Sequence, residues 1–483
     1  MPWQPDMASD EPIFRQIARH FETSIIRGDL PPGTPLPPQR KLARQFNVNR
    51  STITQAYDEL HSLGLVQSHQ GKGTWVSENM WGVSYRRIPN WHQYTSGGAF
   101  LPSRPLAKLI REASSYPGVI NLAEGGLSPE LMPSEDIERL LRQISLPPSL
   151  SYANPRGDGE LRETLAVHWA KEHNLYVDPD EILITTGSQQ ALHLITQCLL
   201  SPGDAIAMEG PSFAYSLPLF TSAGLRLFRL PLDDQGLLPE EVISLHRKHK
   251  IRMIFTNPTY QNPTGTVLGG ARRKRLLAIC EELRLPIVED DAYGSLTLIG
   301  SGKPPRPLKA MDMGGSVLYI GSLSKTLAPG LRIGWLAGPK SVVERLADAK
   351  HVMDSGTGII SQKLAQAYLS SQICQQRLDE LTVALTERRD CMLEALEKNL
   401  MELADWTRPK GSFYVWCRLR QSINEADLLE LGIKHGVIFS PGGIYGAERG
   451  YVRLTYAQAN RRDITEGVRR LRAALVEANP VFR

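Results

Sequence analysis

The sequence predicts a multidomain chain: a small, mainly helical unit of the winged helix-turn-helix kind, followed by a much larger α/β unit. The length of 483 residues corresponds to about three compact units of roughly 150 residues each. Up to residue 64, apolar residues recur at helical spacing, whereas beyond residue 116 short β-branched strands alternate with amphipathic helices. These patterns place the first unit at 1–78, a linker at 79–115 and the second unit at 116–483.

Three helices are predicted in the first unit. The first covers residues 12–28 and the second residues 38–46, each with one apolar face. The third begins after a turn at residues 47–49, where Asn49 is expected to cap it, and ends at Gly64. The buried side of this third helix is expected to consist of Ile53, Tyr57, Leu60 and Leu63.

Residues 66–76 predict a hairpin, because two valines flank a glycine-rich tip. Between Asp29 and Asp58 there is no acidic residue, although four basic ones fall there. A helix-turn-helix can also bind proteins, but this charge distribution favours DNA, with the third helix in the major groove and the wing near phosphates. The residues expected to contact DNA are Arg40, Arg50, Ser51, Thr52, Thr54, Gly71, Lys72 and Gly73.

The composition excludes several classes of protein. Hydrophobic residues make up 41% and charged residues 22% of the chain, which is ordinary for a soluble globular protein. No run of 18 apolar residues occurs, and the first residues lack the layout of a secretory signal, so we expect a cytoplasmic protein. The five cysteines are scattered without a CxxC pair, which indicates neither a disulfide framework nor a metal site.

The second unit is predicted to contain a doubly wound α/β subdomain over about residues 155–340 and a smaller α+β subdomain formed by the flanking segments. The strands of the larger subdomain are expected at 181–185, 205–209, 252–256, 286–290 and 316–320. Those of the smaller one are expected at 413–419, 436–440 and 451–456. No GxGxxG sequence follows the first strand, so a nicotinamide or flavin site is not supported.

Side chains at the ends of these strands fit a different cofactor. Lys325, in SLSKTLAPGLRIGW (322–335), can form an imine with an aldehyde. Asp290, in VEDDAY, can hold a pyridinium nitrogen protonated, and Asn262 and Tyr293 can bind a ring oxygen. Hydroxyls, a guanidinium and the helix start in TTGSQQAL (185–192) can bind a phosphate. The expected phosphate ligands are Ser188, Gln189, Ser322, Ser324 and Arg332.

Each of these signals alone also fits a solvated loop or an ordinary turn. Four of them in order, each at a strand end, predict a site for pyridoxal 5′-phosphate. The array resembles the fold-type I aminotransferases of class I/II over roughly residues 116 to 475. That resemblance implies that Lys325 is the Schiff-base lysine and that the chain forms a homodimer.

The resemblance also implies roles for residues outside the four signals. Phe213, in EGPSF, matches the aromatic residue that stacks on the cofactor ring, although Tyr215 competes for that role. Tyr152 matches a tyrosine that reaches the phosphate of the neighbouring subunit. Arg453, in YVRLTYA, matches the arginine that binds a substrate α-carboxylate, and Gly125, in NLAEGG, lies in the loop over the substrate.

The N-terminal unit resembles the DNA-binding domain of GntR-type bacterial regulators. The resemblance rests on residues 36–66, LPPQRKLARQFNVNRSTITQAYDELHSLGLV, and 70–76, QGKGTWV. In that family the positions of Arg40, Arg50, Thr52 and the wing glycine contact DNA, while Pro38 and Asn49 stand where serine is usual. The whole architecture is similar to the MocR subfamily of GntR regulators.

Three functions are consistent with this architecture. The first is a transcription regulator that binds an operator in double-stranded DNA and senses pyridoxal 5′-phosphate, or an amino acid or amine, through aldimine chemistry at Lys325. The second is a genuine class I/II aminotransferase with a vestigial DNA-binding arm, and the third a cofactor-free dimerisation domain. The full cofactor constellation disfavours the third, and the intact recognition helix and wing favour the first. If the first function holds, the chain is not primarily an enzyme, and residual aminotransferase activity is left as an open alternative.

Overall fold

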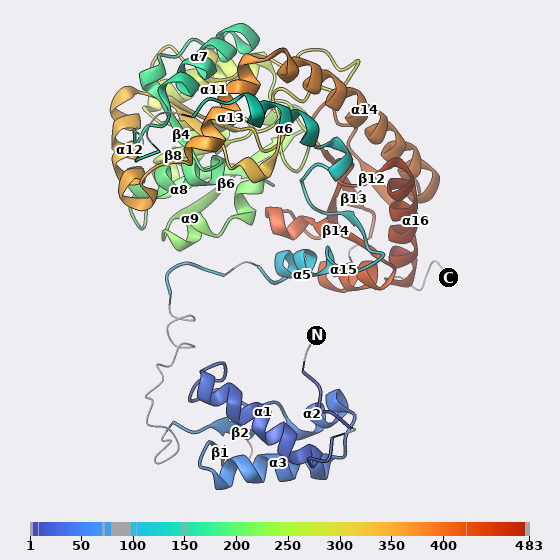
Figure 1. The fold of residues 1–483 in the computed structure, drawn as a ribbon. Coiled ribbons are helices and arrows are strands. Elements are labelled where there is room, and N and C mark those ends of the chain that lie inside the picture. Colours follow the sequence, from blue (N-terminus) through green and yellow to red (C-terminus); the bar gives the residue numbers. More distant parts are fainter. Residues whose placement is uncertain are drawn as a thin grey trace. The chain divides into compact units, whose positions relative to one another are not determined.

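The computed structural model describes residues 3–7, 9–69, 73–78, 98–102, 104–146, 150–152, 154–421 and 423–478. The chain consists of two compact units, Met1–Ala99 and Phe100–Arg483 (Figure 1). Gly71 and Lys72 of the predicted wing, and residues 79–97 of the predicted linker, lie outside the described residues. No helix in the described part of the chain is long and apolar enough to cross a membrane.

The first unit has the helices and hairpin of a winged helix-turn-helix, as predicted. Its elements are α1 (Ile13–Arg27), α2 (Gln39–Phe46), α3 (Arg50–Ser62), β1 (Val66–His69) and β2 (Gly73–Val76). The apolar faces of the three helices pack together and against Val66 and Val76 of the antiparallel hairpin. Two expectations for α3 are wrong. Leu63 is 37% exposed because α3 ends before it, and Asn49 occupies the N-cap position without a side-chain capping hydrogen bond.

The larger subdomain of the second unit is built on an eight-stranded mixed sheet. Its spatial order is β4-β11-β10-β9-β8-β5-β6-β7, and the central run from β10 to β6 is parallel. The strands are β4 (Ile182–Thr185), β5 (Ala205–Gly210), β6 (Arg226–Asp233), β7 (Gly236–Leu237), β8 (Met253–Thr256), β9 (Ile287–Asp290), β10 (Val317–Ser322) and β11 (Gly334–Ala337). The parallel run places the ends of β5, β8, β9 and β10 at one edge of the sheet, where the predicted site residues follow.

Helices cover both faces of this sheet. Alternate strand residues point to opposite faces, so neighbouring residues of one strand pack against different helices. Ile206 and Leu318 pack with α8 and α12, whereas Ala207 and Val317 pack with α10 and α11. At the β4 end, α7 and α13 cover the second face. The helices are α7 (Gly159–His173), α8 (Ser188–Leu199), α9 (Leu219–Ser222), α10 (Glu241–His249), α11 (Gly270–Leu283), α12 (Lys340–Asp354) and α13 (Ile359–Ser370).

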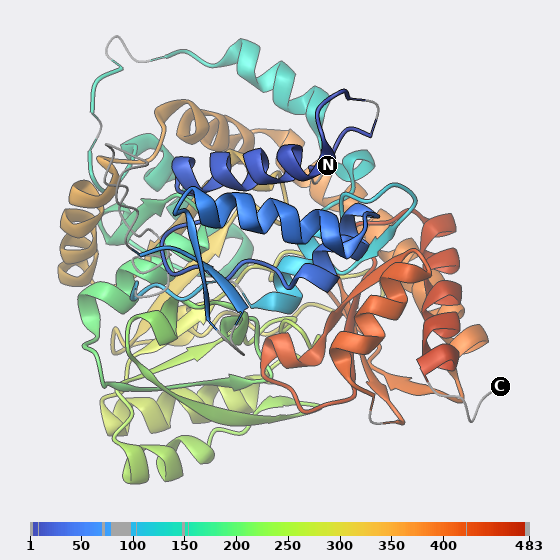
Figure 2. The same cartoon turned by 90° about the horizontal axis from the view of Figure 1, so that it is seen from below.

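The smaller subdomain has a five-stranded sheet in the order β12-β13-β15-β14-β3. It joins distant parts of the chain, since β3 (Ile120–Leu122) pairs in parallel with β14 (Val437–Pro441). Its other strands are β12 (Ala404–Trp406), β13 (Tyr414–Leu419) and β15 (Tyr451–Thr455), and its helices are α5 (Pro105–Ala113), α15 (Glu425–Lys434) and α16 (Arg461–Ala478). The 29-residue helix α14 (Gln372–Leu400) leads into it and packs along α16, as Figures 1 and 2 show.

Short elements complete the second unit. Helix α6 (Ser134–Gln143) contacts α13. Single 3₁₀ turns occur at η1 (Pro129–Leu131), η2 (Pro179–Glu181), η3 (Phe213–Ser216), η4 (Lys309–Met311), η5 (Pro329–Leu331) and η6 (Gly442–Tyr445). Three of these, η3, η5 and η6, contribute residues to the cavity described next.

Candidate functional site

The first unit presents a polar surface at the start of α3. Arg50 and Ser51 are exposed there, as is Arg40 on α2, whereas Thr52 and Thr54 are half-buried. Thr54 donates a hydrogen bond of 3.2 Å to Oε1 of Gln39, which joins the two helices of the helix-turn-helix. The exposed side chains at the start of a second helix are arranged as a major-groove reading surface requires.

Gly73 begins β2, after the tip of the hairpin, with a φ of +98°. This left-handed backbone favours glycine although a Cβ would meet nothing within 4 Å. The backbone conformation therefore favours glycine at this position. Because nothing lies close to the missing side chain, another molecule can approach the backbone there.

The second unit contains a cavity of about 310 Å³ at the carboxyl ends of the parallel strands. The smaller subdomain closes it with Tyr414 of β13, Tyr445 of η6 and Arg453 of β15. The sequence-predicted residues that line it are Gly125, Ser188, Gln189, Phe213, Asn262, Asp290, Tyr293, Ser324, Lys325, Arg332 and Arg453. Tertiary structure thus gathers residues that are separated by more than 300 positions in the sequence.

Three predicted or alternative residues do not line the cavity. Ser322 lies behind it, where its hydroxyl contacts that of Ser324 at 2.7 Å and the carbonyl of Ile333 at 3.0 Å. Tyr152 is 83% exposed. Of the two aromatic residues proposed to stack on a ring, Phe213 lines the cavity and Tyr215 packs beside Gly446 instead.

One end of the cavity suits a phosphate. Gly187 forms a turn before α8 with a φ of +86°, and Gly187, Ser188 and Gln189 line the cavity, so the start of α8, with its unpaired backbone N–H groups, borders it. Arg332 lies against this turn and donates to the carbonyls of Thr186 at 3.0 Å and Pro329 at 3.2 Å. A Cβ on Gly187 would lie 2.6 Å from the Arg332 guanidinium. The cradle therefore combines a helix N-terminus with a fixed positive charge.

A lysine and an acid occupy the middle of the cavity. Lys325 donates from Nζ to the carbonyl of Gly125 at 2.7 Å. Asp290 has a buried Oδ1 without a hydrogen-bond partner. Burial, assisted by the negative charge of Asp291, raises the pKa of Asp290 from 3.8 to about 7, although Lys325 opposes the shift. An unpaired buried acceptor of this kind is suited to a cationic N–H donor.

Arg453 and Asn262 define the third part of the cavity. Nη1 of Arg453 donates to Oδ1 of Asn262 at 2.9 Å, and Nη2 donates to the carbonyl of Ala123 at 2.6 Å. The guanidinium stacks between the rings of Tyr414 and Tyr445, at 4.0 and 4.7 Å from their centres. Its buried Nε has no partner, which leaves a donor for an anionic ligand.

Sequence reasoning missed Tyr414, Tyr445 and Asn257. The hydroxyl of Tyr414 lies 2.8 Å from that of Tyr293. Asn257 donates to the carbonyl of Asp290 at 2.6 Å and accepts the backbone N–H of Asn262 at 2.8 Å. Asn257 begins the segment NPTYQNPTG (257–265), which also contains Asn262, so the repeat of Asn-Pro was its available signal.

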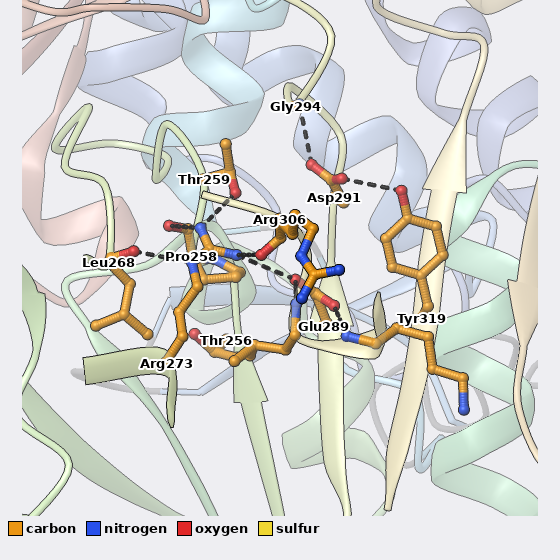
Figure 3. A network of polar contacts seen from close by, with 12 residues as sticks. Thr256, Pro258, Thr259, Leu268, Arg273, Glu289, Asp291, Gly294, Arg306 and Tyr319 are labelled. Carbon is orange, nitrogen blue, oxygen red and sulfur yellow. Dashed lines mark hydrogen bonds and ion pairs between the residues drawn. The ribbon is translucent and has the colours of Figure 1, made fainter. Parts of the chain in front are cut away.

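A network of buried polar contacts supports the floor of the cavity (Figure 3). Arg273 of α11 donates to the carbonyls of Leu268 and Pro258, at 2.8 and 2.9 Å, and lies 3.6 Å from Glu289. Glu289 immediately precedes Asp290 on β9 and accepts backbone N–H groups of Leu308 and Lys309. This network holds both the strand that carries Asp290 and the loop after β8.

Comparison with known proteins bears on both units. Residues 117–471 match the family of class I and II aminotransferases, and residues 14–76 match the gntR family of bacterial regulatory proteins. The chain is 40% identical over 470 residues to the uncharacterized HTH-type transcriptional regulator YisV of Bacillus subtilis, which covers 97% of this chain and 96% of that relative.

The solved structures that resemble this chain include two aminotransferases. The kynurenine aminotransferase of Pyrococcus horikoshii, in complex with PMP, is 32% identical with a TM-score of 0.74, over 83% of this chain and 99% of that one. LysN, the α-aminoadipate aminotransferase of Thermus thermophilus, complexed with N-(5′-phosphopyridoxyl)-L-leucine, is 30% identical with a TM-score of 0.72, over 81% and 99%.

The chain therefore belongs to the class I and II aminotransferase family and carries a gntR-type DNA-binding unit, which defines a transcriptional regulator with an aminotransferase-like domain. Within that class it is a member of the MocR subfamily of GntR-type regulators, as the motifs predicted. The predicted fold class, a winged helix-turn-helix joined to a fold-type I aminotransferase domain, is confirmed.

Proposed function

We propose that this regulator holds pyridoxal 5′-phosphate in the cavity and senses the cofactor itself, or an amino acid or amine, at Lys325. The observation that carries the proposal is the buried Oδ1 of Asp290, which has no partner and faces the same cavity as Lys325. A buried carboxylate oxygen without a donor is costly. A protonated ring nitrogen would satisfy it.

The residues present fit this cofactor. The phosphate would be held by the start of α8, with Ser188 and Gln189, and by Ser324 and Arg332, with Ser322 orienting Ser324. Asn262 and Tyr293 would bind the ring oxygen, and Phe213 would lie on the ring. When bound, pyridoxal 5′-phosphate supplies an aldehyde that reacts with primary amines and a ring that withdraws electrons from the attached carbon.

An amino acid effector would be oriented by Arg453. Its guanidinium is held by Asn262, Ala123 and two aromatic rings, so it is already arranged before any ligand arrives. The unpartnered Nε provides a donor for a carboxylate. If Lys325 were released from the carbonyl of Gly125, its Nζ could accept a proton and return it.

Sensing requires that ligand binding and DNA binding be coupled. A ligand changes operator affinity only if it binds differently to the states that hold DNA well and poorly, and couplings of about 1–3 kcal/mol are typical. We propose a homodimer, with exposed Tyr152 reaching the phosphate of the neighbouring subunit. Paired reading helices would then contact two half-sites of a double-stranded operator in the cytoplasm.

A genuine aminotransferase is the second candidate function. It is supported by the gathering of most of the predicted groups around Lys325 in one cavity and by the names of two similar solved structures. The exposed reading residues at the start of α3 favour the regulator, because an enzyme alone has no use for them.

Two measurements test the proposal. We expect purified protein with pyridoxal 5′-phosphate to develop a visible absorption band, which Lys325→Ala abolishes and the exposed-lysine control Lys340→Ala retains. DNA fragments selected by the protein from random duplexes should bind with an affinity that an amino acid or the cofactor changes severalfold. A wild type without the band, or DNA binding indifferent to every amino compound and to the cofactor, would contradict sensing. Turnover of an amino acid with an oxo acid at about 1–1000 per second would favour the enzyme.

A further inference from the structure

Tyr414 provides a second connection between two parts of the cavity, beside the direct hydrogen bond from Arg453 to Asn262. Its ring lies under the guanidinium of Arg453, 4.0 Å from the ring centre. Its hydroxyl lies 2.8 Å from the hydroxyl of Tyr293. Arg453 belongs to the predicted carboxylate site and Tyr293 to the predicted ring-oxygen site, so Tyr414 touches one member of each.

The position of the Tyr414 hydroxyl is enforced by its surroundings. A Cβ on Gly125 would lie 2.0 Å from this oxygen, so the hydroxyl occupies the space that the missing side chain leaves. The rings of Phe413 and Tyr293 flank the Tyr414 ring edge-on, at 6.1 and 5.7 Å between centres. The Tyr414 hydroxyl therefore packs against Gly125, while its ring contacts two neighbouring aromatic rings.

The direction of the hydrogen bond between the two hydroxyls follows from the role proposed for Tyr293. Tyr293 has a single hydroxyl hydrogen, so when it donates this hydrogen to the ring oxygen it can only accept from Tyr414. The positive charges of Arg453 and Lys325 favour this arrangement, because they lower the pKa of Tyr414 below its ordinary value although burial acts to raise it. Burial raises the pKa of Tyr293 well above its ordinary value.

We propose that Tyr414 is a positioning residue that couples the carboxylate site at Arg453 to the ring oxygen of the cofactor by way of Tyr293. This inference rests on the proposed function. An effector carboxylate on Arg453 neutralises the charge over the Tyr414 ring, so that Tyr414 donates more weakly to Tyr293. Tyr293 then donates more weakly to the ring oxygen, and the cofactor holds its proton more tightly. The charged and titratable groups facing Tyr414 are Lys325, Arg453, Tyr293, Tyr445 and Tyr456.

The test is a pH titration of the absorption band of bound pyridoxal 5′-phosphate, with and without succinate, a carboxylate that has no amine. In the wild type, succinate should raise the pH at the midpoint of this titration. Tyr414→Phe, which keeps the ring, should raise the midpoint without succinate by roughly half to one pH unit, the equivalent of one net hydrogen bond. It should also reduce the further rise with succinate. Tyr414→Met serves as a second variant without the hydroxyl.

A double-mutant cycle separates this coupling from the direct field of the carboxylate. In a Tyr293→Phe background, Tyr414→Phe should leave the midpoint unchanged. Tyr451→Phe is the control, because Tyr451 belongs to β15 of the same sheet, is not among the residues that line the cavity and stacks on Trp416; it should keep the midpoints with and without succinate. An equal effect of Tyr414→Phe in both backgrounds would overturn the inference alone. A wild type that never develops the band would overturn the proposed function, and the inference with it.

Discussion

The guanidinium of Arg273 lies 3.6 Å from the carboxylate of Glu289, and neither side chain is exposed. Arg273 also donates to three backbone carbonyls and to the hydroxyl of Thr259 (Figure 3). Glu289 precedes Asp290 on β9, and Arg273 donates to Pro258 and Thr259 in the loop that carries Asn262. The polar network thus stabilises the cavity floor from within the core.

We expect Arg273→Met to lower the free energy of unfolding by about 3–5 kcal/mol, because it leaves Glu289 buried without a cation and several carbonyls without donors. Urea denaturation followed by circular dichroism measures this. The neighbouring pair Arg275–Glu240 provides the control, since its side chains are 51% and 63% exposed. Arg275→Met should leave the stability nearly unchanged, and equal losses in the two variants would contradict the prediction.

The cofactor-free protein should become less stable as the pH rises from about 4 to 7, in part because of Asp290. Burial raises its pKa from 3.8 to about 7, so the unfolded chain releases this proton first and stability falls through that window. Asp290→Asn cannot ionise, and it should exceed the wild type at pH 8 by on the order of 4 kcal/mol while matching it near pH 4.

Urea midpoints of both proteins at the two pH values check this expectation. Asp405→Asn is the control, because that carboxylate is exposed and pairs with Arg420. If Asp290→Asn had the same stability as the wild type at pH 8, Asp290 would not be held in its neutral form by burial.

Gly125→Ala should weaken the binding of pyridoxal 5′-phosphate by roughly tenfold or more, a typical consequence of overpacking a filled space. The new methyl group would lie 2.0 Å from the Tyr414 hydroxyl and would displace the carbonyl that holds Lys325. Fluorescence titration gives the affinity. Gly330→Ala is the matched control near the cavity, because its Cβ would meet nothing within 4 Å. Equal affinities for the two variants would argue against this close fit.

Arg50→Ala should reduce operator affinity by about 1–3 kcal/mol, because Arg50 is exposed at the first position of α3. Fluorescence anisotropy with a selected duplex measures the change. If Arg50 contacts a phosphate, Arg50→Ala should also make DNA binding less dependent on the salt concentration. Arg15→Ala, an exposed arginine on α1, is the control. A larger loss for Arg15→Ala would place the DNA-binding surface on another face.

The helices and strands were largely predictable because each buries a periodic set of apolar residues. The exceptions have local causes: Leu63 belongs to the apolar series of α3 but follows the last helical residue, so it becomes exposed. The gathering of Lys325, Asp290 and Asn262 in one cavity was predictable, because Asp290 ends β9 and the other two lie in the loops after β10 and β8. Tyr414 was not, since β13 is buried on both faces and periodicity there does not distinguish the cavity side.

The amino-acid sequence alone determined the two-unit organisation and the candidate residues near strand ends, among them Lys325, because these depend on local spacing and side-chain type. Only the tertiary structure decided that Arg273 lies in the core although its ARRKR neighbours suggest a surface helix. It also brought Tyr414 from the smaller subdomain to Tyr293 of the larger one. Contacts between distant segments depend on packing across subdomains, which leaves no periodic trace in either segment.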